Sequence, residues 1–117
     1  MYKRQEQSRR VKKFLQTLTP ESPGYVSLIA LIELAWVLRS RYPLNKAQLI
    51  QCLERLLKYP ELVIEDHTEV EFALRQFSQF KADFADCLIE RLGHAAGCGE
   101  TVTFDVDASR SAGMRLL

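Results

Sequence analysis

The sequence predicts an α/β domain built on a mainly parallel sheet. Short β-prone runs alternate with longer segments of helical spacing, a pattern typical of a parallel sheet flanked by helices. The chain has 117 residues, of which 47% are hydrophobic and 26% charged, and this fits one domain spanning residues 1–117. In such sheets ligands bind beyond the carboxyl ends of the strands, so residues at those ends are the first candidates for a site.

The expected helices and strands are separated by clear breaks. In chain order they are a helix over 6–18, a β-prone pair at 25–26, helices over 27–42 and 45–59, a strand at 62–64, helices over 67–80 and 82–96, a strand at 101–104, a short helix over 107–112 and a strand at 114–117. Ser27 and Asn45 are suited to cap helix N-termini, whereas Pro43 and Pro60 end helices. The first helix is expected to be amphipathic, with Val11, Phe14, Leu15 and Leu18 on one face.

Charge and cysteine content exclude several classes of protein. The formal net charge of +1 gives no overall attraction to nucleic acid. Basic residues do gather locally, where a solvated helix face would also explain them: Lys3, Arg4, Arg9, Arg10, Lys12 and Lys13, then Arg39, Arg41 and Lys46. The three cysteines have unrelated spacings and form no Cys-x-x-Cys pair, which argues against structural zinc. Cys52 and Cys87 lie in apolar helical runs, where a thiol usually packs as a small hydrophobe.

Nothing in the sequence indicates a membrane protein. The basic N-terminus is not followed by the apolar stretch of a signal peptide. The longest apolar run, residues 28–38, is too short to cross a bilayer. We therefore expect a cytoplasmic protein with no membrane partner.

Glu33 is the most informative single residue. It is the only charged position between Leu28 and Leu38, where every other residue is apolar. A helix that is apolar all round is buried on most sides, and a lone buried carboxylate needs a partner or a metal ion. Glu33 is therefore a candidate site residue, unless it lies on a narrow exposed strip or pairs with an arginine such as Arg91.

Further acids stand at a helix start and at a strand end. Asp83, Asp86 and Glu90 share one helix face by their spacing. Asp83 could equally be a helix cap, Glu90 is expected to be solvated, and Asp86 is flanked by apolar residues and is the stronger candidate. Asp105 ends the strand 101–104, where a turn-forming aspartate is the alternative. Asp107 has the better claim to cap the short helix that follows.

Carboxylates from different elements that converge at one strand-end cleft would repel each other. A hard divalent cation relieves such repulsion, and ligation by oxygen alone suits Mg²⁺ or Mn²⁺. Such an ion can activate water and stabilise charge on a phosphodiester during cleavage.

Three segments, in order, resemble PIN-domain toxins of the VapC type. The segments are 26–38 around Glu33, 82–89 around Asp86, and 103–105 ending at Asp105, and the closing residues 114–117 are similar to the family's last strand. The resemblance implies a PIN-like parallel sheet surrounded by helices. It also implies that Glu33, Asp86 and Asp105 are metal ligands with Asp83 beside them, that Mg²⁺ or Mn²⁺ is the cofactor, and that RNA is hydrolysed. A cognate antitoxin and a homodimer are the partners it implies, with the helices around Trp36 and Leu53 as contact candidates. A core role for Trp36 is the alternative.

The chain departs from the family pattern at its start. Family members begin with a short apolar strand that carries the first aspartate and lies in the middle of the sheet, and nothing here matches it. We expect the first, central strand to be missing, which leaves a gap between the strands near Val26 and Val102 and an incomplete metal site. Residues 1–5 read like translated adapter DNA and are expected to be non-native, with a genuine alternative start or a decayed gene as the alternative.

Two other functions compete with the ribonuclease. A catalytically inactive PIN-domain fragment could bind only an antitoxin or a second copy. A phosphoryl acceptor of receiver type would also hold Mg²⁺ at strand ends, but it requires a lysine after Asp105, and none follows.

Overall fold

The computed structural model describes residues 2–117, except for the side chains of residues 2–5, 7, 8, 11 and 111. Its elements, in chain order, are α1 (Tyr2–Thr17), β1 (Gly24–Val26), α2 (Leu28–Ser40), α3 (Lys46–Lys58), β2 (Leu62–Ile64), α4 (His67–Gln79), α5 (Phe84–Ala95), β3 (Val102–Thr103), α6 (Val106–Ser111) and β4 (Arg115–Leu116). Every predicted helix and strand is present, and the α/β fold class is confirmed. The basic side chains of Lys3 and Arg4 lie outside the described residues.

Capping residues set the starts of α2 and α3 as predicted. The Ser27 hydroxyl accepts a hydrogen bond from the Ala30 amide at 3.1 Å. Asn45 and Gln48 form a reciprocal capping box, in which each side chain accepts from the other residue's amide. The cap of α6 differs from the prediction. Asp105, not Asp107, caps it, because the Asp105 carboxylate accepts from the first free amides of the helix, at 2.9 Å from Asp107.

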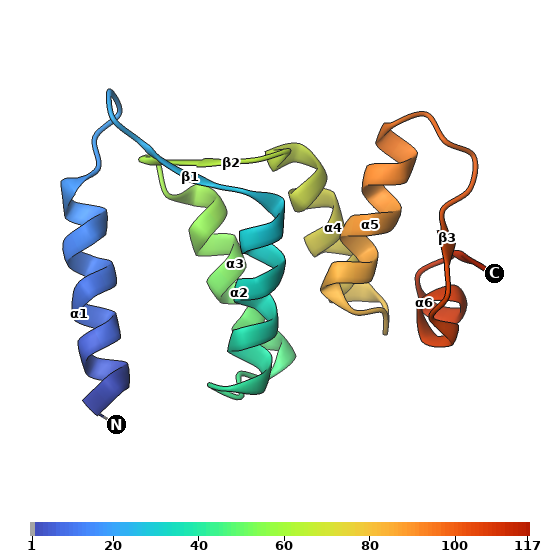
Figure 1. Cartoon of the computed structure of the whole chain (residues 1–117), viewed down its shortest axis with the longest axis horizontal. Coiled ribbons are helices and arrows are strands. Elements are labelled where there is room, and N and C mark those ends of the chain that lie inside the picture. The colour runs from blue at the N-terminus through green and yellow to red at the C-terminus, as the bar shows by residue number, and fades with distance from the viewer. Residues whose placement is uncertain (1) are drawn as a thin grey trace.

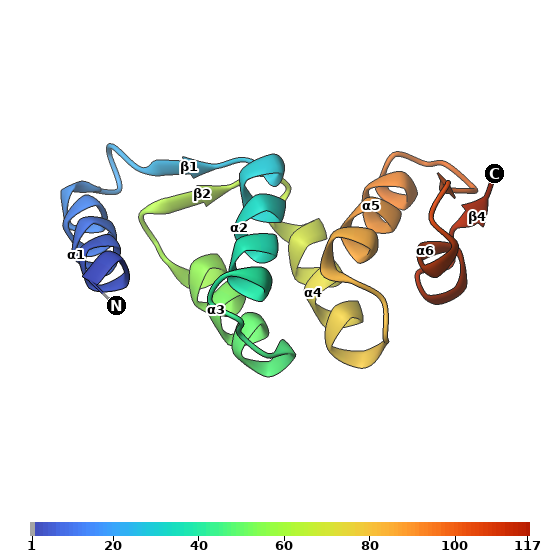
Figure 2. The ribbon, with the colours of Figure 1, turned by 60° about the horizontal axis from the view of Figure 1, so that its bottom comes forward.

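The strands form two separate parallel pairs. β1 pairs with β2, with Tyr25 opposite Val63, and β3 pairs with β4, with Val102 opposite Arg115. Among the described residues no ladder joins β1 to β3, so the sheet is interrupted at the predicted place. In both views the pair β1–β2 lies above α2 and α3, whereas β3–β4 lies at the far end, beyond α5 (Figures 1 and 2).

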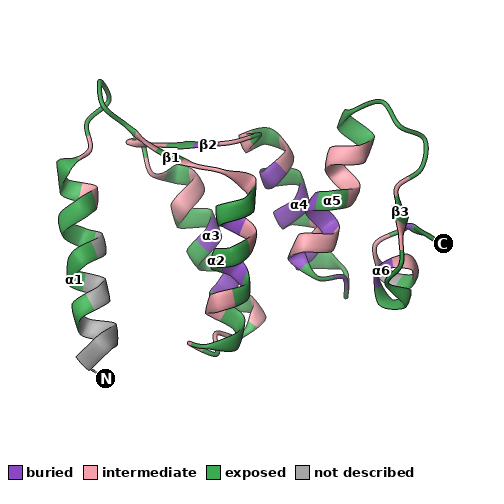
Figure 3. Cartoon of the chain, viewed as in Figure 1, coloured by how far each residue is buried: buried purple, intermediate pink, exposed green. Residues whose placement is uncertain are grey.

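The core lies between α2, α3, α4 and α5, where the buried segments gather (Figure 3). Its largest fully buried side chains are Phe84, Leu31, Leu49, Leu53, Leu88 and Val70. Phe77 packs edge-on against Phe84 with ring centroids 6.0 Å apart, and this contact joins α4 to the start of α5.

The molecule is more extended than its length requires. Its radius of gyration is 15.6 Å, whereas a compact domain of this length has about 13 Å. Large apolar side chains are also left open to solvent, among them Ile29 at 73%, Trp36 at 62% and Phe104 at 84% exposure. An interrupted sheet explains both observations, because the two strand pairs cannot share one continuous core.

α1 stands apart from α2 and α3 at one end of the molecule, and Phe14 on its apolar side is 56% exposed (Figure 1). The expectation that both helical cysteines pack as small hydrophobes is confirmed for Cys87, which is buried, and is wrong for Cys52, which is exposed on α3. In the described part of the chain, no helix is both long enough and apolar enough to cross a membrane.

Candidate metal centre

Asp86 is the centre of a group of acids. It lies in the first turn of α5 and is half-buried beside Phe84 and Cys87, which both belong to the core. Burial raises the pKa of Asp86, and the nearby carboxylates of Asp83, Asp105 and Asp107 raise it further. The start of α5 and the segment after β3 therefore place three acids close enough to Asp86 to oppose its ionisation.

The neighbouring acids are held by the starts of two helices. Asp83 occupies the N-cap position of α5, but its side chain makes no capping hydrogen bond and is exposed. Asp105 caps α6 and is fixed there by its bonds to the Asp107 and Ala108 amides. Because an N-terminal turn stabilises negative charge, these backbone positions reduce the cost of crowding the acids.

Glu33 lies apart from this group. The prediction of a buried carboxylate is wrong, because α2 turns Leu31 and Ala35 into the core and leaves the face of Ile29, Glu33 and Trp36 exposed. The alternative partner is also excluded, since Arg91 pairs with Glu69 at 3.2 Å. The carboxylates that raise the pKa of Asp86 do not include Glu33.

A small hollow of about 130 Å³ marks the closest approach of α2 to the acids. Ile32, Trp36 and Arg39 line it from α2, and Asp83 and Phe84 line it from the start of α5. Glu33 stands one turn before Trp36 on the exposed face. The structure thus brings the helix of Glu33 to the edge of the acid group without bringing its carboxylate into it.

The acids near Asp86 offer oxygen ligands only, which suits a hard cation such as Mg²⁺ or Mn²⁺. Burial and then the neighbouring carboxylates oppose the ionisation of Asp86, and such a cation would relieve the repulsion among the carboxylates. Among the side chains that the structure describes, however, no three His, Cys, Asp or Glu residues are close enough to hold a metal ion. The residues fit the cation in type and charge, but their arrangement is incomplete.

Two acids were not singled out from the sequence. Asp107 was taken only as a cap, although it contributes to the field at Asp86. Glu65, directly after β2, accepts a hydrogen bond from the Leu28 amide at 2.9 Å and so caps α2 from another strand end. Its position after a strand was the available signal.

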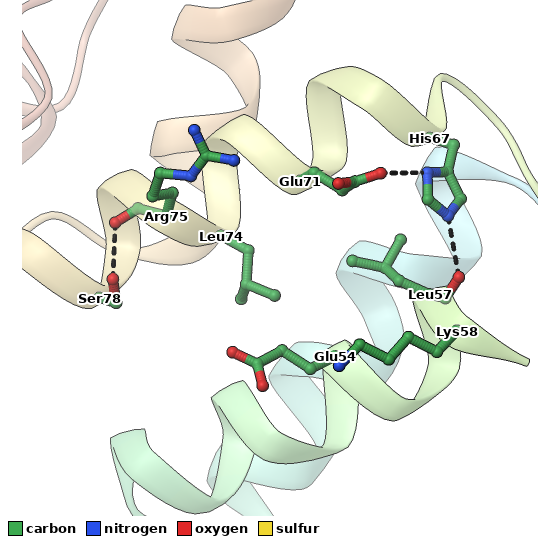
Figure 4. Close-up of a pocket in the computed structure, with 8 residues that line it drawn as sticks. All are labelled: Glu54, Leu57, Lys58, His67, Glu71, Leu74, Arg75 and Ser78. Atoms are coloured by element: carbon green, nitrogen blue, oxygen red, sulfur yellow. Dashed lines mark hydrogen bonds and ion pairs between the residues drawn. The ribbon is translucent and has the colours of Figure 1, made fainter.

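A hollow of about 300 Å³ lies between α3 and α4, away from the acids (Figure 4). His67 bridges it, with Nε2 2.9 Å from the Leu57 carbonyl oxygen and Nδ1 2.6 Å from the Glu71 carboxylate. Both ring nitrogens of His67 already have partners. We therefore interpret this hollow as part of the contact between α3 and α4 and not as a second reactive centre.

Comparison with known families gives one match. The family model of the PIN domain matches residues 1–114. The chain has no significant match among curated proteins or among solved structures.

Proposed function

The chain belongs to the PIN domain family, and on that premise we propose that it is a metal-dependent endoribonuclease of a type II toxin–antitoxin system, of the VapC type. PIN domains are generally nucleases and typically use divalent metal ions. The proposal adds the substrate, RNA, and the cofactor, Mg²⁺ or Mn²⁺.

The single observation that carries the proposal is the environment of Asp86. A half-buried carboxylate whose ionisation is opposed by burial and by three acids is costly for the fold. Such groups concentrate at functional sites, where a ligand offsets the cost. A divalent cation is the ligand that matches oxygen donors and this sign of charge.

The proposed roles are those that the resemblance to PIN-domain toxins implies. Asp86 and Asp105 would hold the cation from α5 and from the segment after β3, Glu33 would hold it from α2, and Asp83 would add negative charge beside them. When bound, the cation lowers the pKa of water and stabilises charge on the phosphodiester. Glu33 can take part only if α2 and the acid group come closer together than they are here.

The interruption of the sheet also affects how close α2 lies to the acid group. An additional strand between β1 and β3 would pair with both and draw the two halves together. A carboxylate at the end of that strand would also supply the first acid of the family pattern. Reading the genomic DNA upstream of the Glu6 codon from an independent template tests this: an in-frame apolar strand with an aspartate supports it, and a stop codon removes it.

The proposed partners are a cognate antitoxin and a second copy, in the cytoplasm. The exposed apolar face of α2, with Ile29 and Trp36, is the surface we assign to them. Large exposed apolar side chains of this kind are typical of protein interfaces.

The test of the nuclease is RNA cleavage in the presence of Mg²⁺. Loss of a group that merely orients a metal ligand costs 10–100-fold, so Asp86→Asn, which removes a ligand, should lower cleavage by more than about 100-fold. Circular dichroism should show that the variant is folded, and Glu54→Gln on the exposed side of α3 is the matched control. Cleavage that survives both Asp86→Asn and EDTA would exclude the proposal.

A second candidate is a catalytically inactive domain that only binds an antitoxin or another copy. The interrupted sheet and the incomplete arrangement of acids, within the described residues, favour it. Co-purification with a co-expressed antitoxin from the neighbouring gene, without Mg²⁺-dependent cleavage, would support this function over the first.

A further inference from the structure

The N-terminal helix holds an unusual share of the positive charge. Six of the 16 Lys and Arg residues lie in residues 1–17, together with one of the 15 Asp and Glu residues. This segment therefore carries five net positive charges, and the remaining 100 residues carry four net negative ones. The net charge of +1 hides a strong separation of charge along the chain.

Three of the described basic side chains of α1 lie on one face. Arg9, Lys12 and Lys13 have the spacing that places them side by side, and all three are exposed. Together with Glu6, Arg10 and Gln16 they line a shallow hollow along the helix. Arg10 is paired with Glu6 at 2.8 Å, whereas no ion pair of Arg9, Lys12 or Lys13 occurs among the described side chains.

The helix has little else to stabilise it. Both views show α1 standing apart from α2 and α3, and it makes no extensive contact with another described element (Figures 1 and 2). Leu18, just beyond its end, approaches Gly24 closely and ties the helix to β1. Isolated helices of this length are marginal in water, so a partner for the basic face would stabilise α1 appreciably.

We infer that the basic face of α1 is a docking surface for the phosphate backbone of RNA. The inference rests on the proposed function, because a polyanionic substrate is repelled by the acidic remainder of the chain and must be held by a separate cationic element. Arg and Lys at helical spacing supply point charges for phosphates without reading sequence. α1 lies at one end of the 44 Å long axis, and α5, β3 and α6, which position the acid group, lie in the other half, so a strand that contacts both runs along the molecule.

An anionic membrane is the main alternative partner of a basic amphipathic helix, and the structure favours RNA. Membrane binding requires an open apolar face that enters the bilayer. Of the described apolar side chains on α1, Phe14 is exposed but Leu15 is partly buried, as is Leu18 after the helix. Among the described side chains the apolar side of α1 is therefore only partly open, whereas Arg9, Lys12 and Lys13 are all exposed.

The test is binding of a fluorescein-labelled single-stranded RNA, followed by anisotropy in EDTA, so that cleavage does not contribute. The variant carries Arg9→Gln, Lys12→Gln and Lys13→Gln; glutamine is a good helix former, and circular dichroism checks the helix content. The matched control carries Arg55→Gln, Lys58→Gln and Lys81→Gln, which remove the same charge from exposed positions elsewhere.

The α1 variant should lose at least about tenfold in affinity, and the slope of log affinity against log salt should fall by about 2, which is about 0.7 for each of three phosphate contacts. The control should stay close to the unmodified chain. Equal losses in both variants, or no loss in the α1 variant, would overturn the inference. The inference would also be overturned if the α1 variant lost its binding to phosphatidylserine vesicles while its RNA binding was unchanged.

The outcome is separable from that of the nuclease proposal. RNA binding in EDTA reports on α1 alone, whereas Mg²⁺-dependent cleavage and its loss in Asp86→Asn report on the acid group. If the chain binds RNA through α1 but does not cleave it, the result supports this inference and excludes the nuclease proposal.

Discussion

At the scale of single residues, Asp86 links the stability of the protein to its proposed activity. Its raised pKa means that the folded state binds the proton more tightly than the unfolded chain does, so ionisation of Asp86 opposes folding. This loss of stability begins as the pH rises above the ordinary value of 3.8 and is complete once the pH exceeds the raised value. The ionised carboxylate of Asp86 therefore lowers the free energy of unfolding at neutral pH.

Asp86→Asn should consequently be more stable than the unmodified chain at neutral pH when no divalent metal is present. The difference should shrink as the pH falls below the raised pKa and should disappear well below 3.8, because Asp86 is then uncharged in both the folded and the unfolded chain. Urea unfolding of both proteins at several pH values measures it. A variant that is less stable than the parent at neutral pH would show that Asp86 is a structural residue.

The cysteines allow a second test at this scale. Burial, together with the charges of Asp86 and Asp83, raises the pKa of Cys87 to about 11, which keeps the thiol protonated and unreactive. Cys52 and Cys98 are exposed. A disulfide reagent at neutral pH should label these two quickly and Cys87 only after addition of denaturant. Rapid labelling of all three in the folded protein would contradict the packing of α5.

At the scale of elements, the junction of α5 with β3 depends on a close approach at Gly93. A Cβ atom at this position would overlap the Thr101 hydroxyl oxygen. The Thr101 side chain is β-branched and stiff, so it cannot turn aside freely. The absence of a side chain at Gly93 therefore lets the segment that leads to Asp105 lie close to the helix that carries Asp86.

Gly93→Ala should therefore destabilise the protein by about 1–3 kcal/mol, measured by thermal or urea unfolding. Gly99→Ala, where no atom lies within 4 Å of the added carbon, is the control. In a double-mutant cycle Thr101→Ala should recover most of the loss, because it removes the clashing oxygen. A Gly93→Ala protein as stable as its parent would show that α5 and β3 are not held at this distance.

At the scale of the whole molecule, the sequence predicted what depends on local signals. Ser27 and Asn45 marked helix starts, the β-prone runs marked the strands, and the departure from the family pattern predicted the break between β1 and β3. These features follow from capping, periodicity and strand propensity, which act over a few residues.

The remaining features depend on what packs against each element. The apolar run of α2 predicted a buried Glu33, but α2 has an uncovered face, and Phe14 is exposed for the same reason. No periodicity in a sequence reveals whether a neighbouring layer is present. The approach of Asp83 and Asp105 to Asp86 can be expected from the sequence, because helix starts and strand ends meet at one edge of the fold. The separation of Glu33 from these acids cannot be expected from the sequence.

The central claim is that the acids around Asp86 bind a divalent cation. Calorimetric titration of Mn²⁺ into the unmodified chain, Asp86→Asn and Glu54→Gln tests it without requiring catalysis. Saturable binding should occur in the unmodified chain and in Glu54→Gln, and it should be lost in Asp86→Asn. No binding by the unmodified chain, or equal binding by all three proteins, would contradict the claim.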